Sequence, residues 1–166
     1  MTNTFDRIAV VYFSYSGRTQ IVAEILRRLC GADLFRVVSE EPYPADWNEL
    51  AQTVKTELET PIVRAVRPVN IDLNRYDTVI LATPTWWHHT AQPLMTWLQT
   101  VDLSGKRVLT CNTHDGGGLM HTREDFENAL PPQTLGTHLT LLDKHVEEAE
   151  PVIRNWLREN GVPTGR

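Results

Sequence analysis

A short polar segment near the N-terminus has residue types that suit an anion. It follows an apolar run over residues 8–13, precedes a helical pattern that opens near residue 19, and reads Ser14, Tyr15, Ser16, Gly17, Arg18 and Thr19. The first N–H groups of a helix lack intrahelical partners and lie at the positive end of the helix dipole. Hydroxyl groups add donors, and a glycine lets the backbone approach closely. The segment predicts a phosphate site, with an ordinary capped turn as the alternative.

Two later segments also place unusual chemistry after an apolar run. One follows residues 78–82 and the other follows residues 108–111. The first contains Pro84, Thr85, Trp86, Trp87 and His88, with His89 behind them, and the second contains Thr113, His114, Asp115, Gly116, Gly117 and Gly118. Both segments stand where a strand would hand over to a helix, as residues 14–19 do.

Strand and helix patterns alternate along the whole chain. Strands are expected over residues 8–13, 34–38, 78–82, 108–111 and 135–142, and helices over residues 19–30, 46–59, 93–101 and 123–130, with a last helix through residues 152–157. This alternation predicts one doubly wound α/β domain, with a five-stranded parallel sheet and helices on both faces. We expect its strands in the order 2-1-3-4-5, one of the common doubly wound orders. In that order, the loops after the first, third and fourth strands meet at one edge of the sheet.

The composition fits a single domain with one core. The chain has 166 residues, of which 41% are hydrophobic, and this length suffices to bury a core. We expect neither a signal peptide nor a membrane span. Cys30 and Cys111 lack a metal-type spacing, so a cytoplasmic location without disulfides is expected.

The charge pattern excludes some partners. The net charge is −5, and residues 40–59 hold six acids against Lys55. No basic stripe is present, which argues against nucleic acid as a partner. The acidic window is interpreted as a solvated helix face, with steering of a cationic partner as the alternative. No metal site is predicted, because His88, His89, His114 and His121 lack a cysteine or carboxylate at ligand spacing.

These residues resemble the flavodoxin family, in particular a small single-domain branch with a Pro-x-Trp-Trp motif. The likeness spans about residues 7–160, and four motifs at matching spacing carry it. They are Tyr12-Phe13-Ser14-x-Ser16-Gly17-x-Thr19, Tyr76-Asp77 leading into Pro84-Thr85-Trp86-Trp87, Leu103-Ser104-Gly105-Lys106, and Thr113-His114-x-Gly116-Gly117-Gly118.

The resemblance implies non-covalently bound flavin mononucleotide (FMN). Its phosphate would lie in residues 14–19, and its isoalloxazine ring would lie between the two later segments. Trp86 and Trp87 offer flat faces for stacking, and backbone N–H groups near Thr85 and residues 115–118 would bond the pyrimidine edge of the ring. The sequence departs from the branch at His88, where glycine is common. His88 and His89 either place a donor or charge beside the reduced flavin or are solvated loop residues.

Two redox functions stay open at this point, together with one alternative of another kind. The chain is either an electron carrier that docks to redox proteins through its acidic window, or a reductase that passes hydride from a nicotinamide to a quinone or similar small acceptor. In the reductase, Trp86, Trp87, His88 and His114 would shape the substrate side. The remaining alternative is a flavin-free binding module on the same fold. The sequence predicts no oligomeric state.

Overall fold

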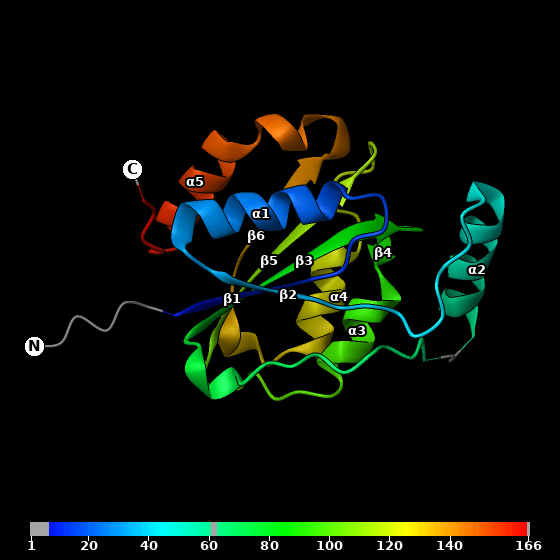
Figure 1. Ribbon diagram of the computed structural model, residues 1–166, viewed down its shortest axis with the longest axis horizontal. Coiled ribbons are helices and arrows are strands. Elements are labelled where there is room, and N and C mark those ends of the chain that lie inside the picture. The colour runs from blue at the N-terminus through cyan, green and yellow to red at the C-terminus, as the bar shows by residue number, and fades with distance from the viewer. Residues whose placement is uncertain (1–6, 61–62, 166) are drawn as a thin grey trace, which may run out of the picture.

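A parallel sheet forms the centre of the computed structural model, which describes residues 7–60 and 63–165 (Figure 1). Its parallel strands lie in the order β2-β1-β3-β5-β6. They are β1 (Ile8–Tyr12), β2 (Asp33–Arg36), β3 (Thr78–Trp86), β5 (Arg107–His114) and β6 (Leu135–Leu142). The predicted α/β class and strand order are therefore confirmed. One strand was not expected, since β4 (His89–Thr90) pairs antiparallel with the end of β3.

Helices cover both faces of the sheet (Figure 1). One face carries α1 (Arg18–Cys30) and α5 (Glu150–Glu159), and the other carries α3 (Gln92–Leu98) and α4 (Thr122–Ala129). Each face buries its own apolar cluster, because central parallel strands are apolar on both sides. Three short 3-10 helices complete the connections: η1 (Leu73–Arg75), η2 (Pro132–Thr134) and η3 (Asp143–Glu148). Among the described helices, none is long and apolar enough to cross a bilayer.

Several predicted boundaries were wrong. β3 runs on to Trp86 and β5 to His114, beyond the expected ends at residues 82 and 111. Their polar ends stay in the ladder because Thr83 pairs with Asn112 and Pro84 with Thr113, which an apolar pattern does not signal. The second strand covers residues 33–36 and not 34–38, and α3 ends at residue 98 and not 101.

The helix α2 (Trp47–Glu59) stands apart from both helical layers, beyond the ends of the strands (Figure 1). Its start matches the sequence prediction, because the Asp46 side chain accepts a 3.0 Å hydrogen bond from Glu49 N. Leu50, Val54 and Glu57 are its buried residues. Only this short stripe faces the protein, so α2 depends on a few specific contacts to keep its place.

A buried ion pair anchors the C-terminal end of α2. Glu57 is 7% exposed, which corrects the interpretation of the whole acidic window as a solvated face. Its carboxylate accepts hydrogen bonds from Arg64 Nη1 at 3.1 Å and from Tyr43 Oη at 2.9 Å. Arg64 also lies over the Tyr43 ring, 3.9 Å from its centroid. Burial raises the pKa of Glu57, while Tyr43 and Arg64 act in the opposite direction.

Replacing Arg64 with methionine is expected to destabilise the fold by about 3 kcal/mol, because it leaves the Glu57 carboxylate buried without its cation. The double variant Arg64→Met/Glu57→Gln is expected to recover part of that loss, since the unpaired charge is gone. Urea unfolding at pH 7 measures both free energies. A single variant that is as stable as the wild type would contradict the anchoring role of the pair.

Candidate functional site

Residues 14–19 join the end of β1 to the first turn of α1. The Ser14 hydroxyl accepts a 3.2 Å hydrogen bond from Gln20 N, which folds the segment back over the helix start. The Thr19 and Thr113 hydroxyls lie 2.9 Å apart and are buried. This hydrogen bond joins the turn directly to the C-terminal end of β5. Ser16 is exposed, and the Arg18 guanidinium lies 3.7 Å from the Glu147 carboxylate.

Gly17 gives the start of α1 the geometry of an anion site. It is the N-cap residue, with a φ of 94°, and has no side chain to cap the helix, so that among the first N–H groups only that of Gln20 is bonded to a side chain of the described residues, Ser14. A Cβ added at Gly17 would meet nothing within 4 Å, so the space in front of the helix terminus is open. A left-handed φ strongly favours glycine. The open N-terminus is therefore available to a negatively charged group.

The second segment forms a two-residue hairpin between β3 and β4. Trp86 pairs with His89, which leaves Trp87 and His88 at the tip. Their φ angles are 48° and 73°, as a type I′ hairpin turn requires. Histidine tolerates this region better than most residues do, and the turn explains why glycine is common at the position of His88. The segment expected to be a loop after residue 82 is therefore the end of β3, a tight turn and β4.

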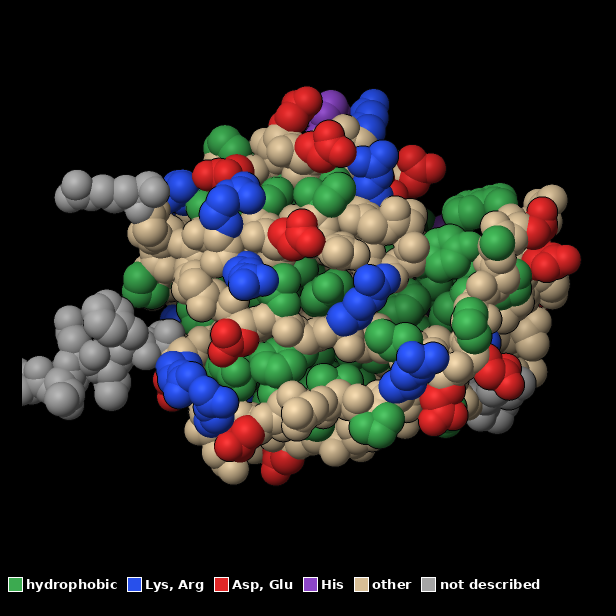
Figure 2. Space-filling view, viewed as in Figure 1, with side chains coloured by type: hydrophobic (Ala, Val, Ile, Leu, Met, Phe, Trp, Pro, Cys, Tyr) green, Lys and Arg blue, Asp and Glu red, His purple; other side chains and the backbone are tan. Residues whose placement is uncertain are grey.

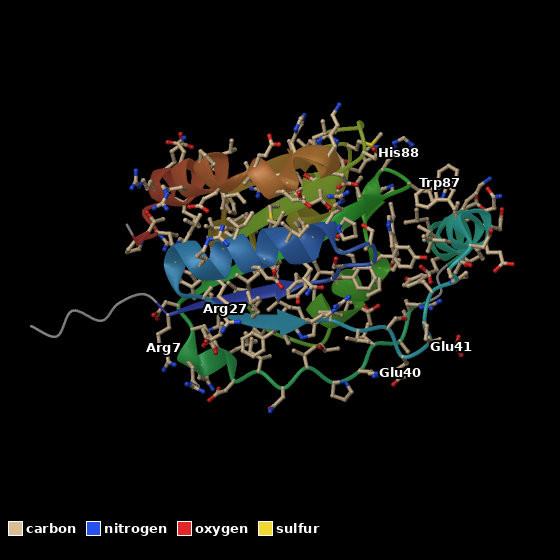
Figure 3. All side chains as sticks on the ribbon, turned by 45° about the horizontal axis from the view of Figure 1, so that its top comes forward. Arg7, Arg27, Glu40, Glu41, Trp87 and His88 are labelled. Carbon is tan, nitrogen blue, oxygen red and sulfur yellow. The ribbon has the colours of Figure 1, made fainter. Side chains whose placement is uncertain are left out.

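The two tryptophans take different roles in this hairpin. Trp86 packs edge-on among three aromatic rings, with centroid distances of 4.9 Å to Tyr43, 5.3 Å to Phe13 and 5.8 Å to Tyr15. Trp87 is 47% exposed, and its indole N–H donates a 2.8 Å hydrogen bond to Ala51 O in α2. Figure 3 shows Trp87 beside α2, with His88 farther from that helix.

The third segment is a tight turn built around His114. The His114 Nδ1 atom accepts hydrogen bonds from Gly116 N and Gly118 N, both at 3.0 Å. Because Nδ1 is an acceptor, a neutral ring carries its proton on Nε2. Gly116 and Gly118 both have positive φ angles. A Cβ at Gly117 would require the flexible Met120 side chain to move, so Gly116 and Gly118 serve the conformation of this turn and Gly117 leaves room for Met120.

A cavity of about 480 Å³ lies where the hairpin, the His114 turn and α2 meet. Figure 2 shows hydrophobic side chains gathered where α2 meets the ends of the strands. The predicted residues that line the cavity are Thr85, Trp86, Trp87, His88, His114, Asp115 and Gly117, and the structure adds Met120, Trp47, Leu50, Ala51 and Val54. Residues 14–19 do not line it. They adjoin it through the Thr19–Thr113 hydrogen bond and the Tyr15–Trp86 ring contact.

Asp143 follows β6 directly and reaches the same edge of the sheet. Its Oδ1 atom is buried and has no hydrogen-bond partner among the described residues. Burial is the main cause that raises the pKa of Asp143, Asp115 adds to it, and a hydrogen bond with Thr113 opposes it. A buried acceptor without a donor costs free energy. We therefore assign this oxygen to the candidate site as a position for a ligand donor.

Other hollows and side-chain clusters have less to offer a planar ligand. A hollow of about 930 Å³ lies on the opposite side of α2, and its lining includes Glu40, Glu41 and Glu49 but no aromatic side chain. Within residues 7–60 and 63–165, no three histidine, cysteine, aspartate or glutamate side chains meet as metal ligands. His89 and His121 each lie 3.0 Å from a carboxylate of α4.

Sequence reasoning missed three features of the site. They are the Met120 side chain, Asp143, and the cavity wall that α2 forms. Asp143 could have been predicted as a site residue, because ligands bind beyond the carboxyl ends of parallel strands and Asp143 follows the last strand. No pattern in the sequence tells that α2 leaves the helical layers. Met120 follows the glycine-rich segment and has a positive φ of 45°. A methionine gives no indication of such a backbone conformation.

Comparison with known proteins adds a family to this geometry. The flavodoxin family model matches residues 7–160. A protein from Bacteroides eggerthii whose crystal structure is described as that of a flavoprotein is 26% identical, with a TM-score of 0.82 over 94% of this chain and 98% of that chain. A flavoprotein from Lactobacillus acidophilus in complex with FMN is 22% identical, with a TM-score of 0.66 over 86% and 97%. Flavodoxin 2 from Bacillus cereus is 18% identical, with a TM-score of 0.56 over 93% and 99%. None of the curated proteins compared matches the chain.

The variant Trp87→Phe is expected to loosen α2, because it removes the hydrogen bond to Ala51 O and keeps an aromatic ring. A lost hydrogen bond of about 1 kcal/mol corresponds to roughly fivefold faster amide hydrogen exchange in the middle of α2. Trp47→Phe is the matched control, since Trp47 is 70% exposed on α2 itself. Equal exchange in both variants would show that the Trp87 bond does not hold the helix.

Proposed function

Because the chain belongs to the flavodoxin family, we propose that it binds FMN and uses it to pass electrons between redox partners. The observation that carries the proposal is the placement of three complementary features along one edge of the sheet. They are the open N-terminus of α1, the unpaired oxygen of Asp143 and the aromatic cavity. The free thiols of Cys30 and Cys111 are consistent with a cytoplasmic location.

The phosphate fits the N-terminus of α1. The N–H groups of the first turn and the Ser16 hydroxyl supply donors without a lysine, and the helix dipole favours negative charge. The open space in front of Gly17 leaves room for the phosphate to approach the backbone. The ribityl chain carries hydroxyl groups, and Asp143 Oδ1 is the buried acceptor that lacks such a donor. The donor set of this chain therefore fits FMN.

The isoalloxazine ring fits the cavity between the hairpin and the His114 turn. Trp86 and Trp87 present aromatic faces there, and Met120 adds a polarisable thioether. His114 lines the same cavity, and its Nε2–H group is available to donate to a carbonyl oxygen or a ring nitrogen. Bound FMN supplies one- or two-electron redox chemistry, and the protein tunes it through such hydrogen bonds and the exclusion of water.

Exposed hydrophobic side chains around the cavity favour a protein as redox partner. Trp47, Trp87, Leu119 and Met120 are all more than a third exposed, and three of them also line the cavity. Tryptophans on a surface are typical anchors of protein interfaces. Glu40, Glu41 and Glu49 line the hollow on the other side of α2, and we propose that they attract a partner with basic residues around its own redox centre.

A second candidate is the reductase that uses a quinone or similar small acceptor. It is favoured by one observation, the wall that α2 adds to the cavity. Leu50, Ala51 and Val54 close the side of the cavity opposite the His114 turn, so a flat apolar molecule could lie between α2 and the ring. In this case His88 and His114 would contact the acceptor.

The variant Gly17→Val is expected to weaken FMN binding more than tenfold, because its side chain occupies the space that the phosphate needs. Gly31→Val is the matched control, since Gly31 ends the same helix with a positive φ of 67° and equally open surroundings. Both variants carry backbone strain of about 1–2 kcal/mol, so their loss of stability is expected to be similar. Fluorescence titration with FMN measures the affinities. Equal affinities in the two variants would remove the helix terminus from the site.

Anaerobic stepwise reduction of the purified protein, followed by its absorbance spectrum, tests the function. Flavin bands near 450 nm with accumulation of a one-electron-reduced form are expected for the carrier. Bleaching in a single two-electron step would favour the reductase. A colourless protein that takes up no added FMN would contradict both functions and point to the flavin-free binding module.

A further inference from the structure

A chain of hydrogen bonds runs beneath the two segments that face the cavity. His138 of β6 lies between two fully buried side chains of β5, Thr110 and Asn112. Its Nδ1 atom is 2.7 Å from Thr110 Oγ1, and its Nε2 atom is 2.7 Å from Asn112 Oδ1. Both ring nitrogens are therefore engaged, while the ring itself lies 6.4 Å, between centroids, from the buried Phe126 ring. The FMN contacts proposed above do not use this histidine.

The partners fix the direction of every hydrogen bond in the chain. Asn112 Nδ2 donates to Gly118 O at 3.0 Å and to Thr85 Oγ1 at 2.7 Å. A backbone carbonyl only accepts, so the amide nitrogen of Asn112 must face it, and Oδ1 must face His138. Because Oδ1 only accepts, His138 carries its proton on Nε2. Its Nδ1 atom is then the acceptor of the Thr110 hydroxyl.

The other end of this chain of hydrogen bonds lies in α4. Arg123 Nη1 donates to Thr110 Oγ1 at 3.1 Å, which leaves the Thr110 proton free to point at His138. Arg123 is itself held by Glu127, with 2.9 Å between Nε and Oε1. Burial and the charge of Arg123 lower the pKa of His138 to about 4. The ring is therefore neutral near pH 7, as the acceptor role of Nδ1 requires.

The chain of hydrogen bonds ends on both segments that line the ring cavity. Thr85 belongs to the hairpin strand β3, and its hydroxyl passes the hydrogen bond on to Thr113 O at 2.9 Å. Gly118 closes the His114 turn, since its N–H bonds to His114 Nδ1. The Asn112 amide thus holds the hairpin and the turn at a fixed separation. The Nε2–H group of His138 stabilises the amide orientation that this requires, because it donates to Oδ1.

We propose that His138 is a positioning residue, which orients the Asn112 amide and so sets the spacing of the two segments that grip the flavin ring. This inference rests on the proposed FMN function for its purpose, although the hydrogen-bond chain itself exists without the cofactor. A loss of the Nε2–H donor would free the Asn112 amide to rotate. The His114 turn would then loosen, and the hydrogen bonds that reach the ring would change.

The test compares His138→Phe, which keeps a ring without donors, with His138→Gln, whose side-chain amide restores a donor to Asn112 and an acceptor to Thr110. In flavin-free protein, the amides of Gly116 and Gly118 are expected to exchange about tenfold faster in His138→Phe and near the wild-type rate in His138→Gln. With FMN, His138→Phe is expected to raise the Kd about tenfold and to shift the midpoint potential of the flavin, and His138→Gln is expected to restore both.

One control separates positioning from a general loss of stability. Val162→Ala removes buried volume from the apolar cluster beneath α1 and α5, on the other face of the sheet from α4, and it is expected to lower stability without moving the glycine exchange rates or the potential. The 15N chemical shifts of His138 in the wild type report directly which ring nitrogen carries the proton.

Unchanged glycine exchange in His138→Phe, a His138→Gln variant as impaired as His138→Phe, or a proton on Nδ1 would each overturn the proposal. Failure of the wild type to bind FMN would instead overturn the proposed function. The exchange and 15N measurements on the flavin-free protein would still decide the role of His138.

Discussion

The shared register of three neighbouring parallel strands is the constraint on which the rest of the structure depends. Tyr12 of β1 pairs with Ala82 of β3, and Ala82 pairs with Cys111 of β5. β1 ends at this level, while β3 and β5 continue side by side to Trp86 and His114, so the segments that follow the three strands take adjacent paths. Segments some 70 and 30 residues apart in the sequence are brought together in this way, and hydrogen bonds such as that between Thr19 and Thr113 then lock them.

Polar contacts, and not a large apolar interface, hold α2 as the remaining wall of the site. The apolar clusters on the two faces of the sheet bury α1, α3, α4 and α5, whereas α2 has only a short apolar stripe and hollows on both sides. The pair Glu57–Arg64 and the Trp87 hydrogen bond fix its two halves. A wall held by a few polar contacts is the part of a structure that opens at the lowest free energy. It suits a site that must admit a large cofactor.

The sequence was sufficient for the architecture and for most of the segments that meet at the site. The end of α1 at Gly31 and the cap of α2 at Asp46 follow local rules, and the structure confirms them. The parallel sheet and its two helical layers followed from alternation and handedness, and the strand order is one of the common doubly wound orders. The resemblance singled out His88 as unusual, and its left-handed φ gives the physical reason.

The parts that could not be predicted depend on contacts distant in sequence. The hairpin of β3 and β4 depends on strand pairing that the residue types of Pro84 and Thr85 do not predict. Glu57 resembles every other acid of residues 40–59 until Arg64 and Tyr43 close over it. The orphaned oxygen of Asp143 and the directed hydrogen bonds of His138 exist only once β5 and β6 lie side by side. Local sequence propensity cannot predict partners that are distant in the sequence.

The central claim is that three loops of one sheet edge hold FMN, with its phosphate on the terminus of α1. Parallel titrations of the flavin-free protein with FMN and with riboflavin test it most directly, because the two flavins differ only in the phosphate. Stoichiometric binding of FMN and binding of riboflavin weaker by about a hundredfold, equivalent to about 2.7 kcal/mol, are predicted. Equal affinity for the two flavins, or no binding of either, would contradict the account.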